Sequence, residues 1–217
     1  MSIALSIGNN LTTGGVFTAD AVNNTSVTNV TDFASLPGGG VLKLLSTQTA
    51  SGSASISFTS GIDSTYDSYV FKFYDIHPQT DNVHFQFNMS TDGGSNYNVT
   101  KTTTFFRAYH DEGIEGEALE YQASRDLAQS TSAHILASDL DNANDASFAG
   151  SMSLYNPSST TFVKHFISRT TALSADYYNY HVFTAGYGNT TSSINAIRFE
   201  MSSGNIDDGI IKMYGVV

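Results

Sequence analysis

The chain has no cysteine and no tryptophan among its 217 residues, and it has only three prolines. Without cysteine, neither a disulfide bond nor a thiolate metal site can contribute to its stability. The apolar stretches are only a handful of residues long, so the sequence predicts no membrane-spanning segment. Residues 1–5 lack the positive region and the long apolar run of a secretory signal, and we expect none.

Charge is also scarce, and positive charge most of all. Charged residues make up 13% of the chain, about half of the usual share. Nine lysines and arginines stand against 20 aspartates and glutamates, which gives a formal net charge of −11. The nine are scattered singly, whereas proteins that bind nucleic acid cluster their basic residues around phosphates. The sequence therefore argues against nucleic acid as a partner. Its abundant Ser, Thr and Asn are typical of proteins that pack into assemblies or face carbohydrate.

A short turn motif is the most informative feature that is present. Residues 90–97 read Ser-Thr-Asp-Gly-Gly-Ser-Asn-Tyr, which fits the Asp-box pattern. In that pattern an aspartate binds the backbone amides of a turn, and an aromatic residue fixes the turn to a sheet. We predict that Asp92 accepts such bonds and that Gly93 or Gly94 has a positive φ. The residues of this structural turn are Ser90, Asp92, Gly94 and Tyr97, with tyrosine where tryptophan is usual.

Strand patterns recur at short spacing after residue 40. In residues 83–89, apolar residues alternate with His, Gln and Asn, and this period-two alternation is typical of a half-buried strand. The best helical candidate, residues 115–128, is interrupted by Gly116 and Ser124. Strands are predicted at residues 41–45, 53–59, 69–76, 83–89, 98–107, 148–155, 161–169, 181–187, 194–201 and 209–217. They predict an all-β fold, an antiparallel β-sandwich of jelly-roll type.

The chain divides at a Pro-Gly-Gly-Gly sequence at residues 37–40, which is typical of a flexible connection. Residues 1–40 contain β-prone pieces but few large apolar residues. We expect them to form an extended N-terminal arm that orders against a neighbouring subunit or a scaffold. Residues 41–217 are expected to form one β-sandwich domain. Its predicted core includes Phe71, Phe73, Phe85, Phe87, Phe162, Phe166, Ile197 and Phe199.

Two polar stretches between predicted strands are candidates for chemistry. The first, residues 110–120, contains His110, Asp111, Glu112, Glu115, Glu117 and Glu120. Its carboxylates could serve glycoside hydrolysis or bind a hard cation. The second contains Asp139, Asp141, Asn142, Asn144 and Asp145. It departs from a calcium loop at its fifth and sixth positions. A solvated loop and a polar turn are the simpler interpretations.

The other common catalytic patterns do not occur. The histidines form no pair with zinc-ligand spacing, and the sequence has neither the nucleophile elbow of serine hydrolases nor a phosphate-binding loop. We therefore predict that the protein is not an enzyme, and we expect no catalytic residues, no metal and no cofactor.

Twelve tyrosines give the chain much of its aromatic character. The densest cluster is Tyr177-Tyr178-Asn179-Tyr180, and Tyr109 lies beside the acidic stretch. Aromatic rings with Asn and Asp suit both sugar stacking and protein interfaces. Because carbohydrate-binding modules usually rely on tryptophan, the pattern favours an interface. The predicted binding residues are Tyr177, Tyr178, Tyr180 and Tyr109.

Several segments resemble those of a known family. They are residues 57–66 (SFTSGIDSTY), 73–82 (FYDIHPQTDN), 126–131 (DLAQST), 155–161 (YNPSSTT) and 201–206 (MSSGNI). Together they resemble a family of small virion-associated proteins of marine tailed phages, of the cyanophage and pelagiphage kind, over residues 41–217. The resemblance implies a structural protein located in the virion, as a head decoration, head fibre or tail-fibre component. It also implies other virion proteins as partners and a homotrimer, since trimers are common among phage fibres and decoration proteins.

Two other interpretations stay open. A glycan- or receptor-binding module on the virion surface fits the tyrosines and the acidic loops, with a host surface glycan as its partner. It is compatible with a structural role in which residues 1–40 attach the protein to the particle. A polysaccharide depolymerase rests only on the scattered carboxylates.

Overall fold

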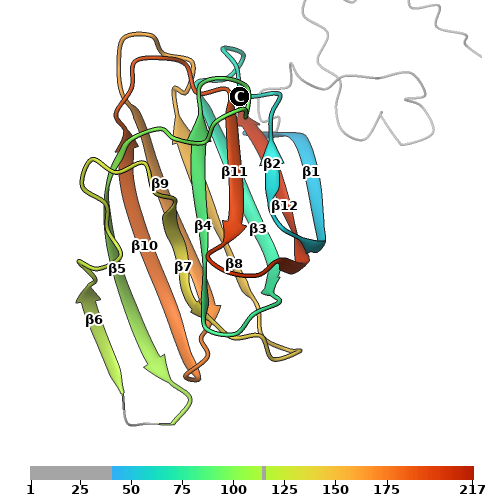
Figure 1. The fold of residues 1–217 in the computed structure, drawn as a ribbon, viewed down its shortest axis with the longest axis vertical. Helices are drawn as coiled ribbons and strands as arrows, with labels where there is room; N and C mark the ends of the chain where they lie inside the picture. Colours follow the sequence, from blue (N-terminus) through green and yellow to red (C-terminus); the bar gives the residue numbers. More distant parts are fainter. Residues whose placement is uncertain (1–40, 114–115) are drawn as a thin grey trace, which may run out of the picture. The chain divides into compact units, whose positions relative to one another are not determined.

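The computed structural model describes residues 41–113 and 116–217, and the predicted arm, residues 1–40, lies outside the described residues. Within these ranges every regular element is a β-strand, there is no helix, and all neighbouring strands run antiparallel (Figure 1). This part of the chain accordingly has no helix that could cross a membrane. The strands are β1 (Leu42–Ser53), β2 (Ile56–Phe58), β3 (Ser68–Pro78), β4 (Val83–Ser90), β5 (Lys101–Asp111), β6 (Glu117–Tyr121), β7 (His134–Leu140), β8 (Phe148–Tyr155), β9 (Lys164–Leu173), β10 (Tyr178–Gly188), β11 (Ala196–Met201) and β12 (Ile206–Val216).

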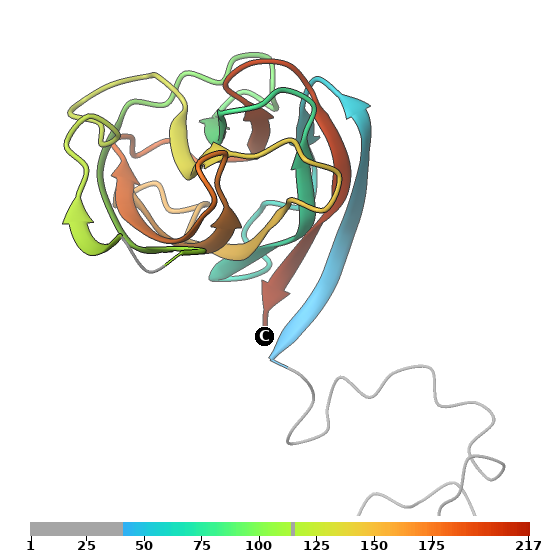
Figure 2. The same cartoon turned by 90° about the horizontal axis from the view of Figure 1, so that it is seen from below.

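The strands form two sheets that lie face to face. The large sheet has eight strands in the order β1-β12-β3-β8-β9-β10-β5-β6, and the small sheet has four in the order β2-β11-β4-β7. Figure 1 shows the small sheet in front of the large one, and Figure 2 shows the same two layers seen along the strands. The predicted all-β, antiparallel sandwich is confirmed at this level.

The first and last strands pair at one edge of the large sheet. Leu42 of β1 lies opposite Val216 of β12, and the amide of Val217 donates to the carbonyl of Val41 (2.9 Å). Among the described residues β1 has a neighbour on one side only, so in this part of the chain it is an edge strand, and it follows directly on the first forty residues.

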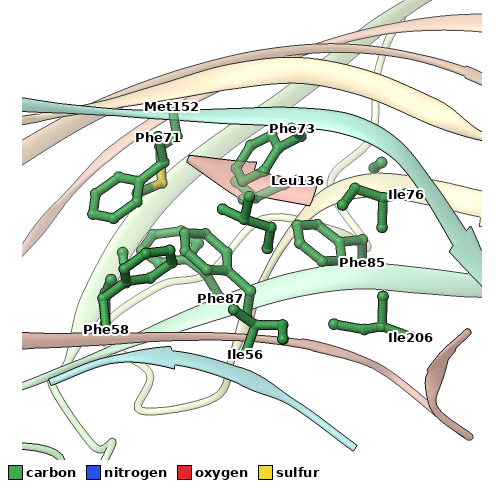
Figure 3. Close-up of a cluster of buried hydrophobic side chains, with 14 of the residues drawn as sticks. Ile56, Phe58, Phe71, Phe73, Ile76, Phe85, Phe87, Leu136, Met152 and Ile206 are labelled. Carbon is green, nitrogen blue, oxygen red and sulfur yellow. The ribbon is translucent and has the colours of Figure 1, made fainter. Parts of the chain in front are cut away.

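Phenylalanine rings from both sheets fill the space between them (Figure 3). Phe199 of β11 lies at their centre, with centroid distances of 5.3–6.4 Å to the rings of Phe58, Phe71, Phe73, Phe85 and Phe87. Aromatic pairs at such distances add to the stability gained from burial. Seven of the eight predicted core residues are buried. The prediction for Phe162 is wrong, because β9 begins only at Lys164 and the Phe162 side chain is 68% exposed.

All ten predicted strands overlap an observed strand, but β6 and β7 were not predicted. The helical candidate at residues 115–128 is wrong, since β6 pairs there with β5. β6 is a short edge strand whose Leu119 is 74% exposed, so it lacks the alternation that a buried face creates. β7 buries His134 and Ser138 beside Leu136. Its inward face is therefore partly polar, which conceals the strand pattern.

Candidate functional site

The hydrogen bonds predicted for the Asp-box turn are confirmed. The Asn96 amide donates to Asp92 Oδ1 (2.9 Å), and the hydroxyl of Ser90 donates to the same oxygen (2.6 Å). These bonds lower the pKa of Asp92 to about 2, and the bond from Ser90 has the largest effect. Gly93 and Gly94 have φ angles of +72° and +89°, which glycine adopts without strain.

The same turn is attached to the small sheet. The ring of Tyr97 lies 4.6 Å from the guanidinium of Arg198 in β11. The Gly93 amide donates to Asn195 Oδ1 (2.8 Å), just before that strand. The arrangement gives the motif a structural role, as the pattern predicts.

Replacing Ser90 with alanine should lower the free energy of unfolding by about 1–2 kcal/mol. The buried hydroxyl donates to Asp92 and accepts from the amides of Asp92 (3.2 Å) and Gly94 (3.0 Å). Urea denaturation measures the change, and Thr91→Ala at the exposed neighbouring position is the control. Equal stability of the two variants would contradict a structural role for the turn.

Three of the four tyrosines predicted to bind a partner pack against one another. The rings of Tyr109, Tyr178 and Tyr180 lie 5.3–5.9 Å apart, and Arg107 lies 4.0 Å from the centroid of Tyr180. Tyr180 is only 5% exposed, so its side chain contributes to packing and is not available to a partner. Tyr177 is 63% exposed. For Tyr177, Tyr109 and Tyr178, binding stays a prediction.

An ion-pair network lies beside these tyrosines. Arg107 donates to Glu120 Oε1 (2.7 Å) and Asp139 Oδ2 (3.0 Å), and Arg125 donates to both oxygens of Asp139 (2.9 and 2.7 Å). Burial raises the pKa of Asp139, but the hydrogen bonds and charge of Arg125 outweigh burial and lower it. Burial also raises the pKa of Glu120, but the hydrogen bond and charge of Arg107 help to lower it overall. Both carboxylates are thus held in place by arginines.

The network corrects the interpretation of the two polar stretches as loops. Glu117 and Glu120 belong to β6, and Asp139 belongs to β7. The rest of the second stretch, residues 141–145, follows β7 and is a polar turn, in which Asp141 Oδ1 accepts from the amide of Ala143 (2.8 Å). In the residues that the structure describes, no group of three or more His, Asp or Glu side chains is placed to hold a metal ion.

The large sheet has a second face, which points away from the small sheet and which we call the outer face. Residues directly opposite one another in neighbouring strands lie on the same face, and the register defines one row of side chains across all eight strands. From β1 to β6 this central row consists of Thr47, Lys212, Lys72, Ser151, Arg169, Phe183, Phe106 and Tyr121. The row contains three positive charges and no carboxylate, in a chain with a net charge of −11.

Each of the two lysines of the central row lies over one aromatic ring. Lys72 and Lys212 are directly opposite each other in β3 and β12. Lys72 Nζ lies 5.6 Å from the centroid of Tyr214, and Lys212 Nζ lies 5.4 Å from that of Tyr74. Cation–π contacts of this kind favour a defined position for each ammonium group.

Arg169 is held from two sides. Its guanidinium lies 5.3 Å from the ring centroid of Phe183, which stacks on Phe106 at 5.0 Å. Its Nε donates to His181 Nε2 (2.6 Å). Burial, and then the charge of Arg169, lower the pKa of His181, which favours the neutral imidazole that this bond requires. Among the described residues Arg169 has no carboxylate partner, in contrast to the other three arginines.

Two shallow hollows flank the central row. One, of about 490 Å³, is lined by Ala149, Gly150, Ser151, Arg169, Thr170, Thr171, Asn179 and His181. The other, of about 520 Å³, is lined by Thr102, Thr103, Thr104, Tyr155, His165, Phe166, Ile167, Ala185, Gly186 and Tyr187. The first hollow is rich in hydrogen-bonding groups, and the second offers exposed aromatic rings.

Sequence reasoning did not find the outer face as a site. Lys72, Arg169 and Lys212 are far apart in the sequence and each is a single basic residue. Only the register of strands from distant parts of the chain places them in one row. The available signal was their outward position in alternating strands, where Lys72 lies between the buried Phe71 and Phe73.

Comparisons with protein-family models, with curated proteins and with solved structures each find no match to the chain. The candidate site is therefore defined by the geometry of this chain alone.

Proposed function

We propose that the protein is a structural component of a phage virion, as a head decoration, head fibre or tail-fibre protein. Residues 1–40 attach it to the particle, and the sandwich, of jelly-roll type, presents its outer face to the surroundings. The resemblance of residues 41–217 to virion-associated proteins supports this assignment. In this proposal the protein is not an enzyme, and its partners are other virion proteins.

The observation that carries the proposal is the position of β1. It is an edge strand of the large sheet and follows directly on residues 1–40. An edge strand leaves backbone amides and carbonyls available on one side, where a strand of another subunit can pair. We propose that the arm and this edge together hold the protein in a homotrimer and on the particle.

Deleting residues 1–36 is expected to abolish attachment and to leave the sandwich folded. The fold of residues 41–217 has its own core of buried phenylalanines, so we expect it to fold without the arm. Purified particles that lack the protein are mixed with full-length or truncated protein, sedimented and analysed by mass spectrometry. Circular dichroism of the truncated protein checks that it is folded.

Two results would contradict this proposal. Truncated protein that sediments with particles as well as the full-length protein does would exclude the arm as the anchor. Absence of the full-length protein from purified virions of the source phage would exclude a virion role altogether.

A second function, a glycan-binding module on the virion surface, is favoured by the outer face. This face combines exposed aromatic rings, hydroxyl groups and unpaired positive charge around two hollows. Exposed apolar and aromatic patches on a protein surface often mark binding sites. The module is compatible with attachment through the arm, since the two use different parts of the chain.

A further inference from the structure

We propose that the outer face binds an acidic polysaccharide, which crosses the strands along the central row with its carboxylate or sulfate groups on Arg169, Lys72 and Lys212. The inference rests on the proposed role of the outer face as the contact surface of the protein. It adds the chemical class of the ligand and the residues that recognise it.

The opposed lysines are the first argument for a negatively charged ligand. Like charges directly opposite each other on neighbouring strands destabilise a sheet. Lys72 and Lys212 are such a pair. The chain has 20 acidic residues, but the central row contains none that could neutralise the two lysines. An anionic group bound to either ammonium group reduces the repulsion, so the pair favours the bound state.

Arg169 supplies the second argument. Its Nε is bound to His181 and its guanidinium lies against Phe183, and among the described residues its terminal nitrogens have no hydrogen-bond partner. Arg169 lines the first hollow, so these nitrogens are available to a ligand there. Guanidinium groups bind carboxylates and sulfates through two parallel hydrogen bonds. In the same hollow Thr171 Oγ1 donates to Asn179 Oδ1 (3.0 Å), so the amide nitrogen of Asn179 is available to a sugar hydroxyl.

The spacing of the charges favours a polysaccharide over nucleic acid. Lys72 and Arg169 are separated by β8, so their backbones are about 10 Å apart, twice the distance between neighbouring strands. This is on the order of the length of a disaccharide, so carboxylates on alternate sugars of an acidic polysaccharide match the spacing. Nucleic acid has a far higher density of charge, which a protein with clustered basic residues neutralises.

The neutral side chains of the row suit the apolar faces of sugar rings. Phe183 and Phe106 stack in parallel beside Arg169, with an interplanar angle of 7°, and Phe106 is 38% exposed. Aromatic rings next to hydroxyl and amide groups are the combination that sugars require, because a sugar ring has both apolar faces and polar edges. A flexible acidic peptide has no comparable flat apolar face.

Affinity electrophoresis of the full-length protein tests the proposal. The probe is polygalacturonate, and the matched control polymer is its fully methyl-esterified form, which has the same backbone without the charges. Polygalacturonate is expected to retard the protein, less so as the salt concentration rises, and the ester is expected not to. Equal retardation by both polymers, or by neither, would overturn the proposal.

Three variants locate the site. Lys72→Gln, Lys212→Gln and Arg169→Gln are each expected to lower the affinity for polygalacturonate about tenfold, as for the loss of one charge-assisted contact. Lys43→Gln is the control, because Lys43 is exposed but lies opposite Gly215, on the other face of the sheet. Equal effects of all four substitutions would overturn the assignment to the outer face.

Unfolding measurements and two further probes complete the test. Lys72→Gln and Lys212→Gln should leave the protein as stable as before or more stable, whereas a merely structural role would make them destabilising. Polyglutamate and single-stranded DNA are expected to bind more weakly than polygalacturonate, and binding as tight to either would overturn the choice of a polysaccharide. None of these measurements uses particles, so their failure is separate from failure of the virion assignment.

Discussion

Replacing Phe199 with alanine is expected to lower the free energy of unfolding by about 3–5 kcal/mol, as for other buried phenylalanines. Phe199 is fully buried and its ring contacts five others from both sheets. Alanine therefore leaves a cavity where the two layers meet. Domains of this size are stable by only about 5–15 kcal/mol, so urea denaturation should show a much lower midpoint.

Phe162→Ala is the matched control for this experiment. The same group is removed, but from a side chain that is 68% exposed, and surface substitutions usually change stability by less than about 0.5 kcal/mol. A loss of stability at Phe162 equal to that at Phe199 would contradict the two-layer core described above.

Acidification from pH 7 to pH 4 is expected to lower the free energy of unfolding by about 3 kcal/mol through His134 alone. His134 is fully buried, and burial, followed by the charge of Lys101, lowers its pKa to about 3 from an ordinary value of 6.5. Between these two pH values the unfolded chain binds a proton that the folded chain does not. The contribution of the neutral His134 to the free energy of unfolding is therefore complete above pH 6.5 and falls as the pH drops toward 3.

Urea denaturation at pH 7 and pH 4 measures this effect. His134→Leu removes the titrating group and should reduce the difference between the two pH values by about 3 kcal/mol, whatever its effect at pH 7. His165→Leu, at an exposed position in β9, should keep the full difference. If both variants respond to acid like the original protein, His134 is not the acid-sensitive group.

Much of the sandwich could be predicted because alternation is a local property of the sequence. Strands such as β4 and β11 place apolar residues on one face and polar, mostly half-buried residues on the other, so Phe85, Phe87 and Phe199 could be assigned to the core from their neighbours alone. β7 could not be recognised in this way. Its buried His134 and Ser138 are polar, and only the surrounding sheets explain why they are inside.

The candidate site could not be predicted, because it depends on register between strands that are distant in the sequence. Lys72 and Arg169 become members of one row only through β8, where Ser151 lies opposite both. The tyrosine cluster shows the converse. Tyr178 and Tyr180 are close in the sequence and suggested a binding surface, but Tyr180 lies in a packed cluster and Arg107 covers its ring.

The pairing of β1 with β12 determines how the domain responds to mechanical load. When the protein is held at Val41 and the paired strand is pulled at Val217, which lies at the same end of the ladder, the hydrogen bond between these two residues is loaded first. The rungs then open one after another, as in a zipper, so the resisting force is that of one or two hydrogen bonds at a time. A pull along the strands, between β1 and the rest of the sheet, instead loads the hydrogen bonds of the ladder together. The same edge is thus weak in one direction and strong in another.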